Sequence, residues 1–152
     1  MRSSVVAAAA LAAALITPRD ARAQASPRDE IARLLGTASR GASQAGYRAE
    51  PRVFDVRSMT GMLPSGGSVV VDATLRAGAR YMVVGVCDGE CQDLDLRVNA
   101  PDGAEVLDED VSDDDVPVLR FTATENGAHP LSVIMSDCRA ELCRFAVKVL
   151  AQ

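Results

Sequence analysis

The chain has 152 residues, which is enough for one ordinary domain and too few for two. It carries 16 basic and 21 acidic residues, so its formal net charge is −5. An acidic chain is a poor binder of nucleic acid and of anionic lipid, and we exclude both classes of partner from our expectations.

Residues 1–25 have the pattern of a secretory signal peptide. Arg2 gives a positive start, Val5–Ile16 is an unbroken apolar run, and two small-x-small triplets end at Ala23 and Ala25. The apolar run is too short to span a bilayer core of about 30 Å. No later segment is longer, so we expect no membrane insertion after signal cleavage. We predict an exported protein, periplasmic or secreted, whose mature chain has a net charge of −7.

Residues 26–52 form the next predicted segment, an N-terminal helix or linker. Ser26 is a good N-cap and Pro27 suits the first helical position. Gly46 would end a helix. Apolar residues recur at helical spacing at Ile31, Leu34, Leu35 and Ala38. Because this stripe is narrow, we favour a short helix or a loose linker over a helix that docks a partner.

From residue 53 the apolar period changes to two, so residues 53–152 are predicted to form one all-β domain. Turn signals separate the strands that we expect at Val53–Arg57, Ser68–Arg76, Arg80–Cys87, Asp93–Asn99, Glu105–Asp110, Val116–Thr122, His129–Met135 and Arg144–Leu150. The run YMVVGV is apolar on both faces, which predicts a central strand beneath the helix or beneath a loop. Short antiparallel strands in this number predict a β-sandwich.

Several motifs within this domain resemble the bacterial pre-peptidase C-terminal domain. They are a strand led by Tyr81, the segment Asp93-Leu94-Asp95-Leu96, the turn Pro101-Asp102-Gly103, the segment Asp114-Asp115-Val116-Pro117, and Gly127. As a set, they cover residues 66–150. The resemblance implies a jelly-roll-like antiparallel β-sandwich that usually accompanies secreted peptidases as a non-catalytic module. Related collagen-binding modules bind calcium.

The chain departs from this family in two places. No peptidase domain precedes the sandwich, and His129 and Pro130 stand where members commonly have glycine-x-tyrosine. The cysteine pairs suggest a stand-alone exported subgroup. We therefore expect a non-catalytic binding module whose partner is an envelope or extracellular protein or polysaccharide.

Four cysteines in an exported chain predict two disulfides. We expect the local pairs Cys87–Cys91 and Cys138–Cys143, each closing a short loop at a strand end. Zinc bound by the four thiolates is the first alternative, although zinc knuckles are typical of reducing compartments. A redox pair at Cys87 and Cys91 is the second. It would make the protein an envelope thiol-disulfide protein, but nearby acidic residues raise a thiol pKa and weaken the nucleophile.

Catalysis has little support in the sequence. The single histidine, His129, precedes a proline, and the chain contains no G-x-S-x-G or H-E-x-x-H motif. A lone histidine at the start of a strand is typical of a surface or turn residue. We therefore expect the protein not to be an enzyme.

Acidic residues are concentrated between residues 88 and 115, where twelve of them face one basic residue, Arg97. Calcium takes about six to eight oxygen ligands and is the one cofactor that this segment suggests. The candidate ligands are Asp93, Asp95, Asp102, Asp113, Asp114 and Asp115. A calcium site would favour a calcium-dependent adhesion or matrix-binding module. The alternative that we favour is a solvated acidic face that prevents edge-to-edge pairing of sheets.

Overall fold

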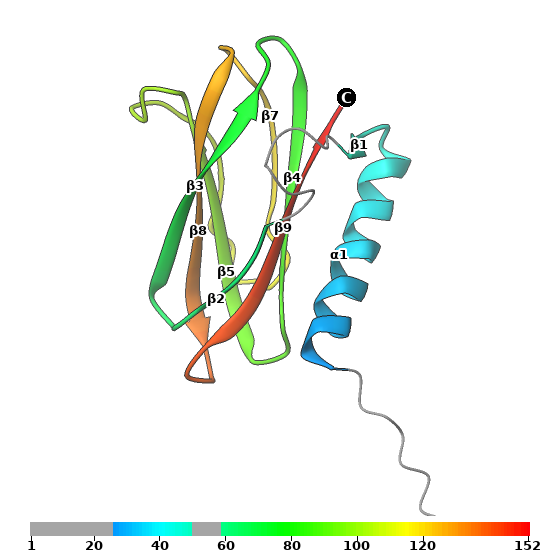
Figure 1. Ribbon diagram of the computed structural model, residues 1–152, viewed down its shortest axis with the longest axis vertical. Coiled ribbons are helices and arrows are strands. Elements are labelled where there is room, and N and C mark those ends of the chain that lie inside the picture. Colours follow the sequence, from blue (N-terminus) through cyan, green and yellow to red (C-terminus); the bar gives the residue numbers. More distant parts are fainter. Residues whose placement is uncertain (1–25, 50–58) are drawn as a thin grey trace, which may run out of the picture.

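The computed structural model describes residues 26–49 and 59–152, which form a β-sandwich of two antiparallel sheets with one helix on its outside (Figure 1). The predicted all-β fold class is confirmed. The signal peptide and the predicted strand at 53–57 lie outside the described residues.

The first sheet has the strand order β1-β9-β4-β7, with β2 pairing along the same strand β9 as β1 does. Its strands are β1 (Arg48–Ala49), β2 (Met59–Leu63), β4 (Arg80–Cys87), β7 (Val118–Thr122) and β9 (Cys143–Ala151). The second sheet has the order β3-β8-β5-β6. Its strands are β3 (Gly67–Leu75), β5 (Cys91–Asn99), β6 (Val106–Asp110) and β8 (Gly127–Cys138).

The core lies between the two sheets and consists of alternate residues from each strand. The inward residues of the central strands are fully or almost fully buried, as in Leu94, Leu96 and Val98 of β5. Their outward neighbours are partly exposed, which is the alternation that the sequence predicts. Gly85 of β4 allows the sheets to approach closely, because a Cβ atom there would lie 3.3 Å from Leu94 Cδ2 and from Leu96 Cδ1 of β5 in the other sheet.

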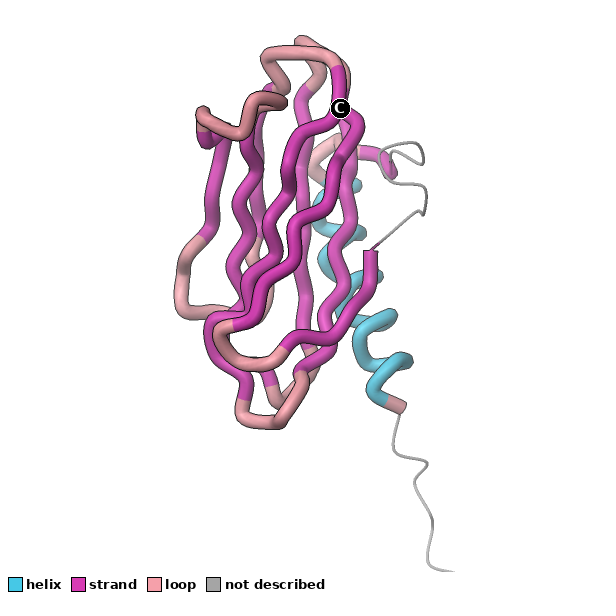
Figure 2. Tube along the Cα trace, turned by 60° about the vertical axis from the view of Figure 1, so that its left-hand side comes forward, coloured by secondary structure: helices cyan, strands magenta, loops and turns pink. Residues whose placement is uncertain are grey.

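The helix α1 (Pro27–Gln44) lies along the outer face of β4 and β9 (Figures 1 and 2). Ser26 caps it in a capping box with Asp29, and Gly46 follows its end with a φ of +91°. Three outward residues of β4 are buried beneath it: Met82, Val84 and Val86. The prediction of a central strand beneath a helix is therefore confirmed, and the alternative of a loose linker is wrong for residues 27–44.

Two strands of the first sheet were not predicted. β1 has only two residues, and β2 contains Gly61, which interrupts the apolar alternation. Gly61 pairs with Phe145 of β9, and a Cβ atom on Gly61 would lie 2.6 Å from the Phe145 ring. The glycine thus makes room for the ring of the neighbouring strand. In the part of the chain that the structure describes, no helix is long and apolar enough to cross a membrane.

Candidate functional site at the disulfide-clipped end

Two connections cross between the sheets at the end of the sandwich where α1 begins (Figure 1). Residues 87–91 lead from β4 to β5, and residues 138–143 lead back from β8 to β9. We call these segments the first and the second arch. The arches lie side by side because β4 pairs with β9 in one sheet and β5 pairs with β8 in the other, where Cys91 is the register partner of Cys138.

A disulfide closes each arch. Cys87 bonds to Cys91 and Cys138 bonds to Cys143, and the Cα atoms of each pair are 5.9 Å apart. All four cysteines are buried, with exposed fractions between 0 and 7%. The structure therefore has the local pairing that we expected, and its sulfur atoms are bonded to each other instead of being available as thiolate ligands or nucleophiles.

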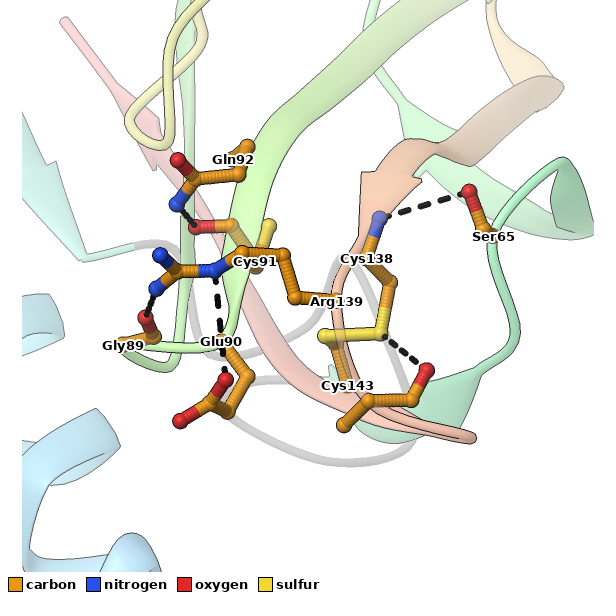
Figure 3. Close-up of polar contacts among 9 residues, drawn as sticks. Ser65, Gly89, Glu90, Cys91, Gln92, Cys138, Arg139 and Cys143 are labelled. Atoms are coloured by element: carbon orange, nitrogen blue, oxygen red, sulfur yellow. Dashed lines mark hydrogen bonds and ion pairs between the residues drawn. A yellow bond between two sulfur atoms is a disulfide. The ribbon is translucent and has the colours of Figure 1, made fainter.

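Arg139 ties the two arches together (Figure 3). Its backbone N–H donates to the Glu90 carbonyl at 2.9 Å, and its Nη2 donates to the Gly89 carbonyl at 2.6 Å. Its Nε also lies 3.9 Å from Glu90 Oε2, but both side chains are more than half exposed, so this ion pair adds little. The two hydrogen bonds to carbonyl oxygens thus fix the tip of the second arch against the first.

Further hydrogen bonds hold the bases of the arches. Asp88 Oδ2 accepts the Arg144 N–H at 2.9 Å, and the Asp88 N–H donates to the Arg144 carbonyl at 3.1 Å. Ser65, in the turn between β2 and β3, accepts the Cys138 N–H at 3.3 Å (Figure 3). The tips at 89–90 and 139–142 remain exposed while their bases are fixed.

The acidic loop between β6 and β7 lies beside the first arch. The Leu94 N–H donates to the Asp114 carbonyl at 2.9 Å. The Asp115 carbonyl oxygen lies 3.7 Å from Cys87 Sγ, and this contact is not a hydrogen bond because the disulfide sulfur carries no hydrogen. We call residues 87–93, 111–116 and 136–144 together the clipped end. Eight acidic and two basic residues fall within it.

Asp93 lies where the acidic side chains come closest to one another. Burial raises its pKa above the ordinary value of 3.8, and the neighbouring carboxylates of Asp95, Asp113, Asp114 and Asp137 raise it further. The clipped end therefore has a concentrated negative potential, which is a field that attracts cationic groups.

The structure brings four of the six candidate calcium ligands close enough for three of the carboxylates to raise the pKa of the fourth. The affected residue is Asp93, and the other three are Asp95, Asp113 and Asp114. Asp102 lies in the turn after β5, at the opposite end of the sandwich. The Ser136 hydroxyl donates to Asp95. Among residues 26–49 and 59–152, no group of three or more metal-binding side chains is arranged to hold an ion, and calcium binding stays a prediction.

Two aspartates of β6 satisfy the open edge of β7. Asp108 Oδ2 accepts the Arg120 N–H at 2.6 Å, and Asp110 Oδ2 accepts the Val118 N–H at 2.8 Å. Burial alone would raise the pKa of Asp110, but hydrogen bonds from Val118 and Ser112 outweigh it, and with the charge of Arg120 they lower this pKa. These carboxylates occupy N–H groups that another strand would use, so they disfavour edge-to-edge pairing at β7.

His129 differs from its prediction as a surface or turn residue. It is 0% exposed, because it shares the inward face of β8 with Leu131, Val133 and Met135. Its Nδ1 lies 3.1 Å from the Gly127 carbonyl, and its Nε2 is buried without a hydrogen-bond partner. A histidine shielded in this way cannot reach a substrate in solvent.

Sequence reasoning did not identify Arg139, Ser65 or Asp137 as part of this end. One signal was present, because the segments GVCDGEC and SDCRAELC both close a strand with paired cysteines. From that signal, the two cysteine-containing segments could be placed side by side only if it were known that β4 pairs with β9 and that β5 pairs with β8. These are contacts between distant parts of the chain that no local pattern contains.

No family model matches this chain, and no curated protein matches it. Among solved structures, it is similar to Aeromonas hydrophila PliG, a periplasmic lysozyme inhibitor of g-type lysozyme, with 17% identity, a TM-score of 0.46, and coverage of 62% of this chain and 84% of PliG. It is also similar to PirA, with 14% identity, a TM-score of 0.38, and coverage of 60% of this chain and 92% of PirA. Likenesses this distant assign neither a family nor a ligand.

Proposed function

We propose that this protein is an exported, non-catalytic module that binds a protein partner through the clipped end. The observation that carries the proposal is the pair of arches, whose bases are fixed by disulfides and hydrogen bonds while their tips are exposed. Loops held on a rigid scaffold are common binding sites. Loops that are already ordered lose less conformational entropy when they bind.

The charge of the clipped end favours a cationic partner. Its eight acidic residues stand against two arginines, and Arg139 is partly engaged with the first arch. Such a field speeds encounter with a positive surface and disfavours negative ones. Leu142, which is 44% exposed at the tip of the second arch, adds an apolar contact among these charges.

Export and the resemblance to the pre-peptidase C-terminal domain belong to the same proposal. Two disulfides are typical of proteins that fold in an oxidising compartment. The resemblance implies a non-catalytic module. Both are consistent with a protein that works outside the cytoplasm by binding.

The test compares two charge-reversed proteins with the unmodified one. The first carries Asp113→Lys and Glu141→Lys, both exposed at the clipped end. The control carries Glu105→Lys and Glu125→Lys, which are exposed at the opposite end and change the net charge equally. Each protein is immobilised and exposed to an envelope extract of the native organism, and the retained proteins are identified by mass spectrometry.

We expect a partner that the unmodified protein and the control retain and that the clipped-end variant loses. For that partner, reversal of two interface charges should weaken binding by about tenfold or more, with a strong dependence on salt. Equal loss in both variants would show that overall charge, not the clipped end, governs binding. Equal retention by all three proteins would place the binding surface elsewhere.

A further inference from the structure

A groove of about 610 Å³ separates α1 from β2. Its volume is within the range of about 300–1,000 Å³ that is usual for small-molecule sites. The helix rests on β4 and β9, while β2 extends the sheet beyond it. A small and exposed residue on the helix wall, Ala32 of α1, leaves this space open.

The floor and walls of the groove are mainly apolar. Ile31 and Leu35 line it from the helix, Met62 from β2 and Ala146 from β9, whereas the neighbouring Phe145 side chain packs in the core between the sheets. Met62 is 42% exposed although it is a large apolar side chain. Contiguous apolar surface that stays open to solvent marks an interaction site more often than scattered apolar residues do.

Two arginines also line the groove: Arg28 in the first turn of α1 and Arg144 of β9. In the described part of the chain, neither side chain forms an ion pair or a hydrogen bond. Of the carboxylates near the start of α1 and the first arch, Asp29 accepts hydrogen bonds from Ser26, and Asp88 accepts the Arg144 backbone N–H through Oδ2, while its Oδ1 has no partner in the described structure. Two unpaired cations beside an apolar groove, in a chain of net negative charge, match a ligand with an anionic head.

We propose that this groove binds a single-chain amphiphile with an anionic head group, of the fatty-acid class. The alkyl chain lies along Leu35, Met62 and Ala146, and the carboxylate faces Arg28 and Arg144. Arginine suits this role because its planar guanidinium can bind a carboxylate through two parallel hydrogen bonds. Arg144 lies at the base of the second arch and so borders the clipped end, but the groove uses neither of the exposed arch tips to which we assign protein binding.

The test measures binding of decanoate and dodecanoate to the purified exported protein by calorimetry, below the concentrations at which they form micelles. Dodecyltrimethylammonium, with the same chain and the opposite charge, is the comparison ligand. We expect dodecanoate to bind about tenfold more tightly than decanoate, because it buries two more methylene groups. The cation should bind at least about tenfold more weakly than dodecanoate.

Variants separate the head group from the chain. Arg28→Gln with Arg144→Gln should weaken dodecanoate binding by about tenfold or more, whereas Arg33→Gln with Arg40→Gln, on the same helix but outside the groove, should leave it unchanged. Ala32→Trp should fill the groove and abolish binding while the melting temperature is kept, since Ala32 is exposed and tryptophan is tolerated in helices.

Three results would each overturn the proposal. They are equal affinity for the cation and the carboxylate, unchanged affinity in Ala32→Trp, and binding to anionic vesicles without binding to monomeric dodecanoate. If the double arginine variant does not fold, the exposed Arg28→Gln alone decides the head-group question. The clipped-end variant Asp113→Lys with Glu141→Lys should still bind dodecanoate, so failure of one proposal is distinguishable from failure of the other.

Discussion

At the level of single residues, two aspartates of the acidic segment have pKa values shifted in opposite directions, so they affect stability in opposite ways. Burial and like charges raise the pKa of Asp93, so its stabilising contribution is present below 3.8 and is lost as the pH rises through the raised pKa. Hydrogen bonds lower the pKa of Asp110 against the effect of burial. The contribution of Asp110 is therefore present above 3.8 and is lost as the pH falls through the lowered pKa.

Replacing each of these aspartates by asparagine should therefore have opposite effects near pH 7. Asp93→Asn removes a repelled charge and should increase the free energy of unfolding by about 0.5–1 kcal/mol. Asp110→Asn weakens hydrogen bonds to a charged acceptor and should decrease it by about 1–3 kcal/mol. Urea unfolding near pH 7 and near pH 3 measures both effects, and the gain in Asp93→Asn should vanish at the lower pH. If both variants changed the free energy of unfolding in the same direction near pH 7, this explanation would be wrong.

Residue-level prediction worked where chemistry is local. The cysteine spacing was sufficient to predict the two short loops, and the N-cap at Ser26 placed the start of the helix. It failed for His129, which was expected at an exposed strand start, whereas β8 begins at Gly127 and His129 lies within the strand. Because alternate side chains of a strand share a face, the two-residue spacing of His129 from the apolar Leu131 already indicated its inward direction.

The arches are the elements whose contribution to stability is easiest to isolate. Each disulfide joins cysteines only four or five positions apart, so it constrains the unfolded chain modestly. Replacing Cys87 and Cys91 together by alanine should lower the free energy of unfolding by about 2 kcal/mol, and the Cys138 and Cys143 pair should cost a similar amount.

Far-UV circular dichroism and denaturant unfolding check this expectation. The sheet signal should be retained in each double variant, because the register of β4 with β9 and of β5 with β8 does not depend on the sulfur bonds. A double variant that is unfolded in buffer would show that the arches nucleate the fold. No measurable loss would show that the unfolded chain already holds the loops closed.

At the level of elements, the sequence predicted approximately seven of the nine strands that the structure describes in residues 26–49 and 59–152, and it missed two. Strands such as β5 alternate polar and apolar residues over their whole length, and this pattern is sufficient to identify them. β2 has a glycine at its centre, and β1 is too short to show a period. Both are strands because they pair with β9, which is a tertiary cause and not a local one.

For the whole molecule, the relevant quantity is the net negative charge, which is −5 for the full sequence. We expect millimolar calcium chloride to raise the melting temperature no more than sodium chloride of equal ionic strength does, because both act by screening. A specific site would instead stabilise the folded state by about 2.7 kcal/mol at a hundredfold excess over Kd. Differential scanning fluorimetry distinguishes the two, with magnesium as a further comparison.

The control for this experiment is Asp95→Asn, which removes a candidate ligand charge. A melting temperature that rises in calcium alone and falls back in this variant would establish the calcium site and revive the adhesion alternative. Equal rises in both salts, unchanged by the variant, would leave the acidic segment as a solvated face that protects the sheet edge.

The closure of each arch at its base also affects how the protein can change over generations. A substitution at the exposed tips, 89–90 or 139–142, alters what the clipped end presents to a partner but touches little of the core. Apart from Arg139, whose side chain holds the arches together, recognition and folding thus depend on different residues. Related proteins could therefore adapt to a changed partner through substitutions at the tips alone. We expect sequence divergence among them to be greatest between the paired cysteines, at residues 88–90 and 139–142.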